Sequence, residues 1–91
     1  MTDDNITSPS EKGSYRTKDS SVNFSGTASD NIGVIKVTWS NDVTGGSGTA
    51  NGLDNWSVYG ISLADGKNTI TITAIDEAGN NGSAQLIVFS K

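Results

Sequence analysis

Hydrophobic and polar residues alternate along several short stretches of the chain, which is typical of β-strands with one buried face. In residues 68–76, isoleucine and alanine alternate with threonine. In residues 21–28, Val22 and Phe24 alternate with polar residues. The same period of two continues in residues 34–40 and 83–89, so these four stretches are predicted to be strands.

The period also assigns side chains to faces. In residues 34–40 it places Ile35, Val37 and Trp39 together on the buried face, so Trp39 is predicted to lie in the core. Trp56 is in phase with the hydrophobic residue two positions later and is likewise predicted to be buried.

Two stretches carry features beyond simple alternation. In residues 55–63, two hydrophobic pairs are out of phase by one residue across Gly60, which predicts a bulge or kink there. In residues 83–89, the period leaves Ile87 and Phe89 on the outer face. These two side chains either cover that face or dock on a neighbouring domain.

Three weaker stretches complete the pattern. Residues 6–8 and 15–17 are interpreted as edge pairing, because Pro9 ends the first stretch and has no amide hydrogen to donate. Residues 43–50 contain Gly45–Gly48, a segment with three glycines, so they are predicted to form an edge strand with a bulge.

The strands recur about every 8–13 residues with turn-forming residues between them, and no helical period intervenes. This arrangement predicts an all-β fold, a seven-stranded immunoglobulin-like (fibronectin type III-like) antiparallel β-sandwich. We expect residues 1–4 to be a disordered or linker tail and residues 5–91 to be a single domain.

Composition supports this class and narrows the chemistry. Ser, Thr, Asn and Gly make up 43 of the 91 residues, and these residues suit strands and turns. The chain has no Cys and no His, which excludes disulfides and His-based catalysis. A net charge of −4 makes nucleic-acid binding unfavourable. No stretch approaches the roughly 20 apolar residues of a membrane helix, so membrane insertion is not expected.

Two loops supply a candidate metal site. In an immunoglobulin-like strand order, Asp30 and Asp76 lie in loops at the same pole, with Asn80 nearby. Carboxylate and amide oxygens are ligands that Ca²⁺ accepts, so these three residues could begin a weak calcium site. The alternative is that Asp and Asn serve as turn formers. We expect no other cofactor.

The aromatic residues supply a second candidate. A carbohydrate-binding face needs several exposed, coplanar aromatic rings. With both tryptophans assigned to the core, only Tyr15 and Tyr59 remain for such a face. No pattern of catalytic residues accompanies them, so we expect no enzymatic activity.

Several segments together resemble a known family, the bacterial immunoglobulin-like modules of secreted and cell-surface proteins, including the group typified by domain B of glucodextranase. The resemblance extends over most of the chain, from about Ile6 to Val88. The segments that carry it are Ser25–Val34, Val37–Asn41, Gly45–Ala50, Trp56 and Leu63–Asn80.

The resemblance implies a non-catalytic spacer or adhesion module of a larger secreted or surface-anchored bacterial protein, located outside the cell or at its surface. The implied partners are neighbouring domains of the parent chain and a cell-surface glycan or protein. As an isolated module, the chain is expected to be a monomer. The alternative is a carbohydrate-binding accessory module of a secreted glycoside hydrolase.

Overall fold

The computed structural model describes residues 3–8, 13–29 and 33–90, and within them the chain forms eight strands and no helix. The sequence predicts seven strands. The difference lies at the start of the chain, where two strands form and each joins a different sheet. The strands are β1 (Asp3–Ser8), β2 (Ser14–Thr17), β3 (Ser21–Ser29), β4 (Val34–Asn41), β5 (Ser47–Thr49), β6 (Asn55–Ser62), β7 (Gly66–Asp76) and β8 (Asn81–Ser90).

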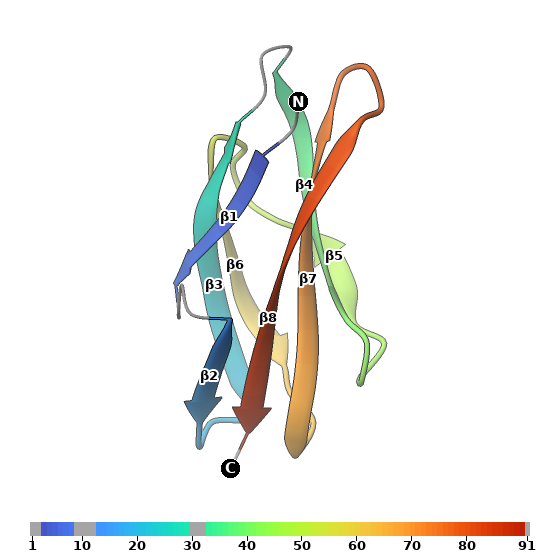
Figure 1. Cartoon of the computed structure of the whole chain (residues 1–91). Coiled ribbons are helices and arrows are strands. Elements are labelled where there is room, and N and C mark those ends of the chain that lie inside the picture. Colours follow the sequence, from blue (N-terminus) through green and yellow to red (C-terminus); the bar gives the residue numbers. More distant parts are fainter. Residues whose placement is uncertain (1–2, 9–12, 30–32, 91) are drawn as a thin grey trace.

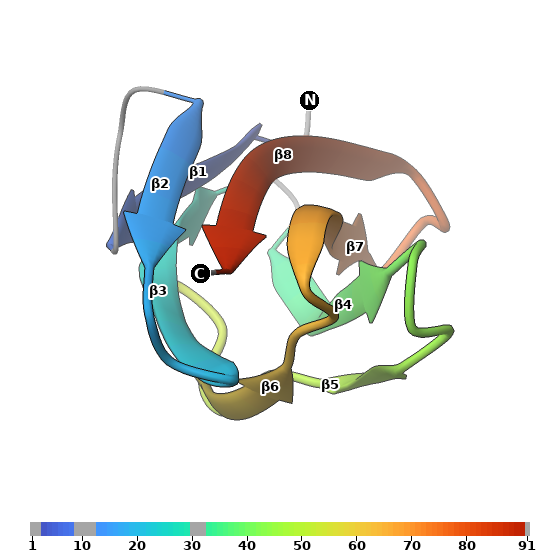
Figure 2. The same ribbon diagram turned by 90° about the horizontal axis from the view of Figure 1, so that it is seen from below.

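The strands form two sheets that face each other, as the end-on view in Figure 2 shows. One sheet has the order β1-β3-β6 and the other the order β2-β8-β7-β4-β5. The predicted all-β immunoglobulin-like sandwich is therefore confirmed. All strand pairs are antiparallel except β2–β8, which is parallel and departs from the predicted arrangement. β1 pairs within the three-stranded sheet, whereas β2 pairs at the edge of the five-stranded sheet, where it runs in the same direction as β8.

The sandwich is elongated, with extents of 40 × 23 × 17 Å. β1 begins at one end of the long axis and β8 finishes at the other (Figure 1). We call the end where β1, β4, β6 and β8 begin the N-terminal pole, and the opposite end the C-terminal pole. Asp3 and Asp4 belong to β1 and pair with Ser29 and Ala28, so the first strand begins inside the segment expected to be a tail.

The core lies between the two sheets. Trp56 is 1% exposed, which confirms its predicted burial, and it packs with the inward residues of both sheets. The alternation predicted for the strands at 21–28, 68–76 and 83–89 is observed as alternating burial. The other buried hydrophobic residues are Val22, Phe24, Ala28, Val34, Val37, Ala50, Val58, Ile61, Ile70, Ile72, Ala74, Leu86 and Val88.

The predicted bulge at Gly60 is confirmed. In the β3–β6 pair, Val22 lies opposite Ile61 and Phe24 lies opposite Val58, so β6 has one more residue than β3 between these positions. Gly60 has φ +72°, a conformation that favours glycine, and its amide donates to Asn23 Oδ1 at 2.9 Å. The extra residue returns the hydrophobic side chains of β6 to the core.

The predicted inward face of β4 is wrong at its first residues. Val34 is buried, whereas Ile35 is 55% exposed. The cause is an irregularity in the β4–β7 pair, where the register shifts between Val34 and Lys36. A shift of one residue exchanges the two faces of a strand, so Ile35 points outward.

Trp39 is half-buried and packs against the core from the edge of the five-stranded sheet, so its predicted full burial is wrong. Gly48 of β5 lies opposite it. A Cβ atom built on Gly48 would lie 2.8 Å from Trp39 Nε1, closer than real contacts allow. The glycines of β5 therefore leave room for the indole ring.

This contact predicts that Gly48→Ala lowers the free energy of unfolding by about 1–3 kcal/mol, because the added methyl overpacks the ring. Denaturant unfolding followed by circular dichroism measures the effect. In a Trp39→Phe background, the clashing indole nitrogen is absent and the same substitution should cost less. An equal loss in both backgrounds would contradict the proposed contact.

Two buried asparagines join the loops at the C-terminal pole. Asn68 Nδ2 donates to the carbonyl oxygens of Ala64, Gly66 and Val88 at 2.9, 3.1 and 3.2 Å. Its Oδ1 accepts from the Ala64 amide at 2.8 Å and from Asn41 Nδ2 at 3.2 Å. Because both side chains are almost completely buried, their hydrogen bonds replace contacts that water would otherwise supply.

Asn41 extends the same network to the β4–β5 loop. Its Nδ2 also donates to Ser62 O at 3.2 Å, and its Oδ1 accepts from the Val43 amide at 3.0 Å. The pair therefore connects the loop after β4, the turn between β6 and β7, and the end of β8.

Candidate functional site

The predicted calcium residues are only partly described. Asp30 lies outside the residues that the structure describes, whereas Asp76 and Asn80 lie in the β7–β8 hairpin at the N-terminal pole. Figure 1 shows that this hairpin, the beginning of β4 and the end of β3 are at the same end of the sandwich. The described residues contain no group of three or more Asp, Glu, His or Cys side chains placed to hold a metal ion.

Asp76 and Asn80 bind each other. Asp76 is buried, and its Oδ1 accepts from the Asn80 amide at 2.8 Å while its Oδ2 accepts from Asn80 Nδ2 at 3.2 Å. The Asp76 amide donates to Asn80 O at 2.9 Å. These contacts are those of a turn-forming Asp, the alternative interpretation. The calcium site stays a prediction.

We expect 10 mM Ca²⁺, compared with chelator at matched ionic strength, to raise the melting temperature by only a few degrees. A millimolar site at this concentration contributes on the order of 1 kcal/mol. The rise should be lost in Asp76→Asn and retained in Glu77→Gln, which changes the exposed neighbouring carboxylate. A rise of the same size in Asp76→Asn would place the ion elsewhere.

The two tyrosines do not form a common face. Tyr59 is 69% exposed and lies on β6 of the three-stranded sheet. Tyr15 is half-buried on β2 of the five-stranded sheet and packs against the core. A sugar ring could stack on Tyr59 alone, without a second coplanar ring from Tyr15.

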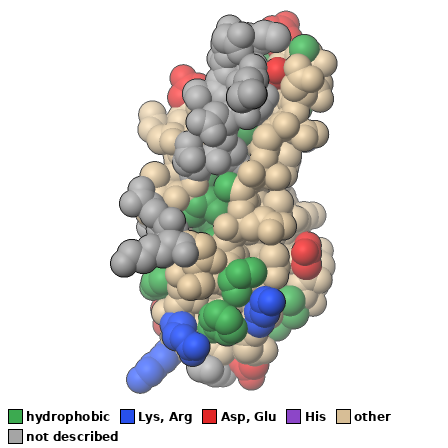
Figure 3. Space-filling view, viewed as in Figure 1, with side chains coloured by type: hydrophobic (Ala, Val, Ile, Leu, Met, Phe, Trp, Pro, Cys, Tyr) green, Lys and Arg blue, Asp and Glu red, His purple; other side chains and the backbone are tan. Residues whose placement is uncertain are grey.

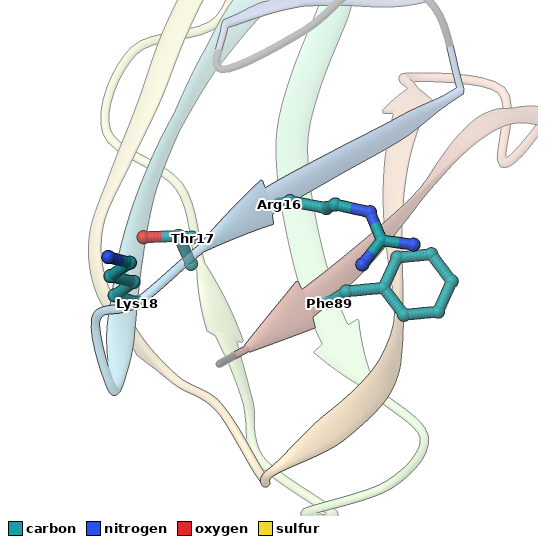
Figure 4. A pocket seen from close by; sticks show the side chains of 4 residues that line it. All are labelled: Arg16, Thr17, Lys18 and Phe89. Carbon is teal, nitrogen blue, oxygen red and sulfur yellow. The ribbon is translucent and has the colours of Figure 1, made fainter.

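Sequence reasoning missed a hollow at the C-terminal pole. It has a volume of about 310 Å³ and is lined by Arg16, Thr17, Lys18 and Phe89. The Arg16 guanidinium carbon lies 4.9 Å from the centre of the Phe89 ring, which is a cation–π contact. Figure 4 shows Arg16 reaching toward Phe89 while Thr17 and Lys18 point to the other side. The available signal was the outward position of Phe89, which the alternating burial of β8 confirms.

Lys67 adds a second cation beside the same ring. Phe89 lies opposite Arg16 in the β2–β8 pair and opposite Lys67 in the β7–β8 pair. Side chains directly opposite each other point to the same face of a sheet, so the three form a row across the outer face. On the face in Figure 3, the Lys and Arg side chains gather around exposed hydrophobic side chains toward the C-terminal pole.

Carboxylates lie toward both poles. Several lie at the upper end of the face in Figure 3, which is the N-terminal pole. Asp54 and Glu77 are exposed there, and Asp54 O accepts from the Ala28 amide near the end of β3 at 3.0 Å. Asp19, Asp42 and Asp65 are exposed in the connections at the C-terminal pole, so the cations beside Phe89 form a local row rather than a basic pole.

No helix in the described part of the chain is long and apolar enough to cross a membrane. The two-sheet sandwich, with hairpin loops at both poles, agrees with the strand pattern of the sequence.

The solved structures that share the fold include the following two. The first contains fibronectin(III)-like modules of CbhA from Clostridium thermocellum, with a TM-score of 0.74 and 20% identity over 99% of this chain. This chain spans 46% of that one, about half its length. The second is CopC from Methylosinus trichosporium OB3b, with a TM-score of 0.57 and 17% identity over 98% of this chain and 94% of that one. These similarities show the fold alone.

Comparison with curated protein sequences finds no significant match. The model of the bacterial Ig-like domain family matches residues 2–89, nearly the whole chain. With the two-sheet sandwich described above, this match shows that the chain belongs to the bacterial Ig-like domain family.

Proposed function

We propose that this chain is a non-catalytic spacer or adhesion module of a larger secreted or surface-anchored bacterial protein. The observation that carries the proposal is the placement of the first and last strands. β1 begins at one end of a sandwich that extends 40 Å, and β8 finishes at the other. A chain that enters at one pole and leaves at the other separates whatever precedes and follows it.

The buried contacts of the module support the spacer role. A rigid spacer needs a cooperative core and fixed polar loops rather than a binding cavity. The core is continuous between the sheets, and Asn41 and Asn68 fix the loops of the C-terminal pole. Ser90 Oγ donates to Asp19 O at 2.7 Å and fixes the end of β8 against the β2–β3 turn. The path of the chain through the module is thereby held by buried contacts.

The test places the chain between two rigid fluorescent proteins and measures their separation by small-angle X-ray scattering. We expect the centre-to-centre distance to increase by about the 40 Å length of the module over a direct fusion. A fusion of the Trp56→Ala variant, measured in denaturant, controls for an unfolded linker. An increase of less than half that length would overturn the spacer proposal.

The same chain should show no retardation in affinity gels that contain soluble glucan. Retardation that disappears in Tyr59→Ala would instead support the carbohydrate-binding alternative, since Tyr59 is the exposed aromatic residue among those described.

A further inference from the structure

We propose that Asn51 is a deamidation site, where the side-chain amide is lost spontaneously and the backbone is converted to an isoaspartyl linkage. The inference goes beyond the proposed spacer function and does not depend on it. The chain contains two Asn-Gly pairs, Asn51-Gly52 and Asn81-Gly82. Both asparagines are exposed, so exposure does not distinguish the pairs. The two pairs differ in the backbone amide that has to react.

The reaction is an attack on the asparagine side chain by the backbone nitrogen of the next residue. The Gly52 nitrogen bonds to Asn51 Cγ, and the bond from Cγ to the side-chain nitrogen breaks. The proton of the Gly52 amide leaves with that nitrogen as ammonia, and a succinimide ring remains. Water then opens the ring at either carbonyl, which gives aspartate or isoaspartate. Glycine favours the attack because it has no Cβ atom to restrict the rotation of its backbone.

The Gly82 nitrogen is held in the β7–β8 ladder, where Gly82 lies opposite Ala74. The Asp76 amide donates to Asn80 O at 2.9 Å. Because hydrogen-bonded pairs alternate along an antiparallel ladder, this bond places the next hydrogen-bonded pair at Ala74 and Gly82. Ring formation at Asn81 therefore requires that this end of β8 detach from β7.

The Gly52 nitrogen lies in the exposed connection between β5 and β6, and no acceptor among the described residues receives its hydrogen. Asn51 itself is held by an isolated bridge. Its amide donates to Ser57 O and its carbonyl oxygen accepts from the Ser57 amide, both at 2.8 Å. Opening one such bridge costs less free energy than opening a continuous ladder. The attacking nitrogen is therefore more accessible at Asn51 than at Asn81.

The fold requires the glycine that makes Asn51 reactive. Gly52 has φ +85°, a conformation that favours glycine. A Cβ atom built on Gly52 would also collide with the backbone carbonyl oxygen of Asn55, the first residue of β6. A larger residue that slowed the attack would therefore distort the start of β6. The reactive pair follows from the tight connection between the sheets.

Isoaspartate at this position would change the edge of the three-stranded sheet. β6 is the last strand in the order β1-β3-β6, and the bridge from Asn51 to Ser57 lies along its open edge. An extra methylene carbon in the backbone would move the oxygen that accepts from the Ser57 amide. The new carboxylate would also change the formal net charge by one unit, from −4 to −5. We therefore expect the start of β6 to open more often.

The test is incubation of the folded chain at mildly alkaline pH, followed by digestion at acidic pH and mass spectrometry of the peptides. The chain unfolded in urea, incubated in parallel, gives the intrinsic rate of each Asn-Gly pair. We expect folding to slow the reaction less than about tenfold at Asn51 and more than about a hundredfold at Asn81, because the second site requires opening of the ladder. Fragmentation spectra distinguish isoaspartate from aspartate.

Asn51→Gln is the matched control, because attack on the longer side chain would form a larger ring much more slowly. It should remove the main modified species and leave the melting curve unchanged, since the bridge to Ser57 uses backbone atoms. In the aged wild type, the Ser57 amide should exchange its hydrogen at least about tenfold faster than before incubation. The aged Asn51→Gln variant should keep its original exchange rate.

Two results would overturn the proposal. Folding that slowed the reaction at Asn51 as much as at Asn81 would show that the isolated bridge holds Gly52 as firmly as the ladder holds Gly82. Isoaspartate at Asn51 without faster exchange at Ser57 would contradict the predicted loosening of β6.

Discussion

Replacing Trp56 with alanine should lower the free energy of unfolding by about 3–5 kcal/mol, the range for truncating a large buried aromatic residue. Trp56 is 1% exposed and is the largest of the fully buried side chains. A domain of this size has a total stability of about 5–10 kcal/mol, so the substitution should remove a large share of it. Urea unfolding of the wild type and the variant measures the loss.

Two further variants separate the loss of the buried ring from the effect of the indole nitrogen and from the removal of an exposed aromatic side chain. Trp56 Nε1 is buried and has no hydrogen-bond partner in the described structure. Trp56→Phe removes this unpaired donor and keeps an aromatic ring, so it should cost less than half as much as alanine. Tyr59→Ala removes an exposed aromatic residue and should change stability by less than about 0.5 kcal/mol. A Trp56→Ala loss below about 1 kcal/mol would contradict the core described above.

Asn68→Ala should cost about 3–4 kcal/mol, because it leaves several buried backbone groups without their partners. The side chain is completely buried and makes five hydrogen bonds, four of them to the backbone. Chemical denaturation, compared with the exposed Asn55→Ala variant, measures the effect. A loss equal to that of Asn55→Ala would show that the pole is held by other contacts.

A double-mutant cycle with Asn41→Ala resolves the network further. The two asparagines share one hydrogen bond of 3.2 Å, so the double variant should lose less stability than the two single variants combined. Strict additivity would indicate that Asn41 and Asn68 act separately.

The sequence predicts strands and their faces where the hydrophobic period is unambiguous. The phase change across Gly60 was readable because hydrophobic pairs lie on both sides of it. The shift in β4 was not readable, because Ile35 is in phase with Val37 in an uninterrupted period of two, whereas Val34 faces the core only through the register shift between Val34 and Lys36. Apolar residues on adjacent positions carry no information about which one faces the core.

The polar features were harder to predict. Asn68 and Asn41 adjoin turn residues, and Asn is common in exposed turns. The residue type alone therefore does not distinguish an exposed turn from a buried network. Their role depends on burial by strands that are distant in sequence. The hollow beside Phe89 likewise depends on the pairing of β2 with β8, and sequence periodicity does not specify which strands pair. The turn contacts of Asp76 were anticipated as the alternative to calcium binding.

The parallel β2–β8 pair gives the module a mechanical property. When tension is applied at the two termini, β2 is drawn toward the N-terminal pole and β8 toward the C-terminal pole. The paired residues Ser14–Thr17 and Ile87–Ser90 then slide past each other, and their interstrand hydrogen bonds are loaded together rather than opened one after another. We therefore expect resistance to stretching to be concentrated in this short pair, and single-molecule pulling would contradict this if weakening β2 left the unfolding force unchanged.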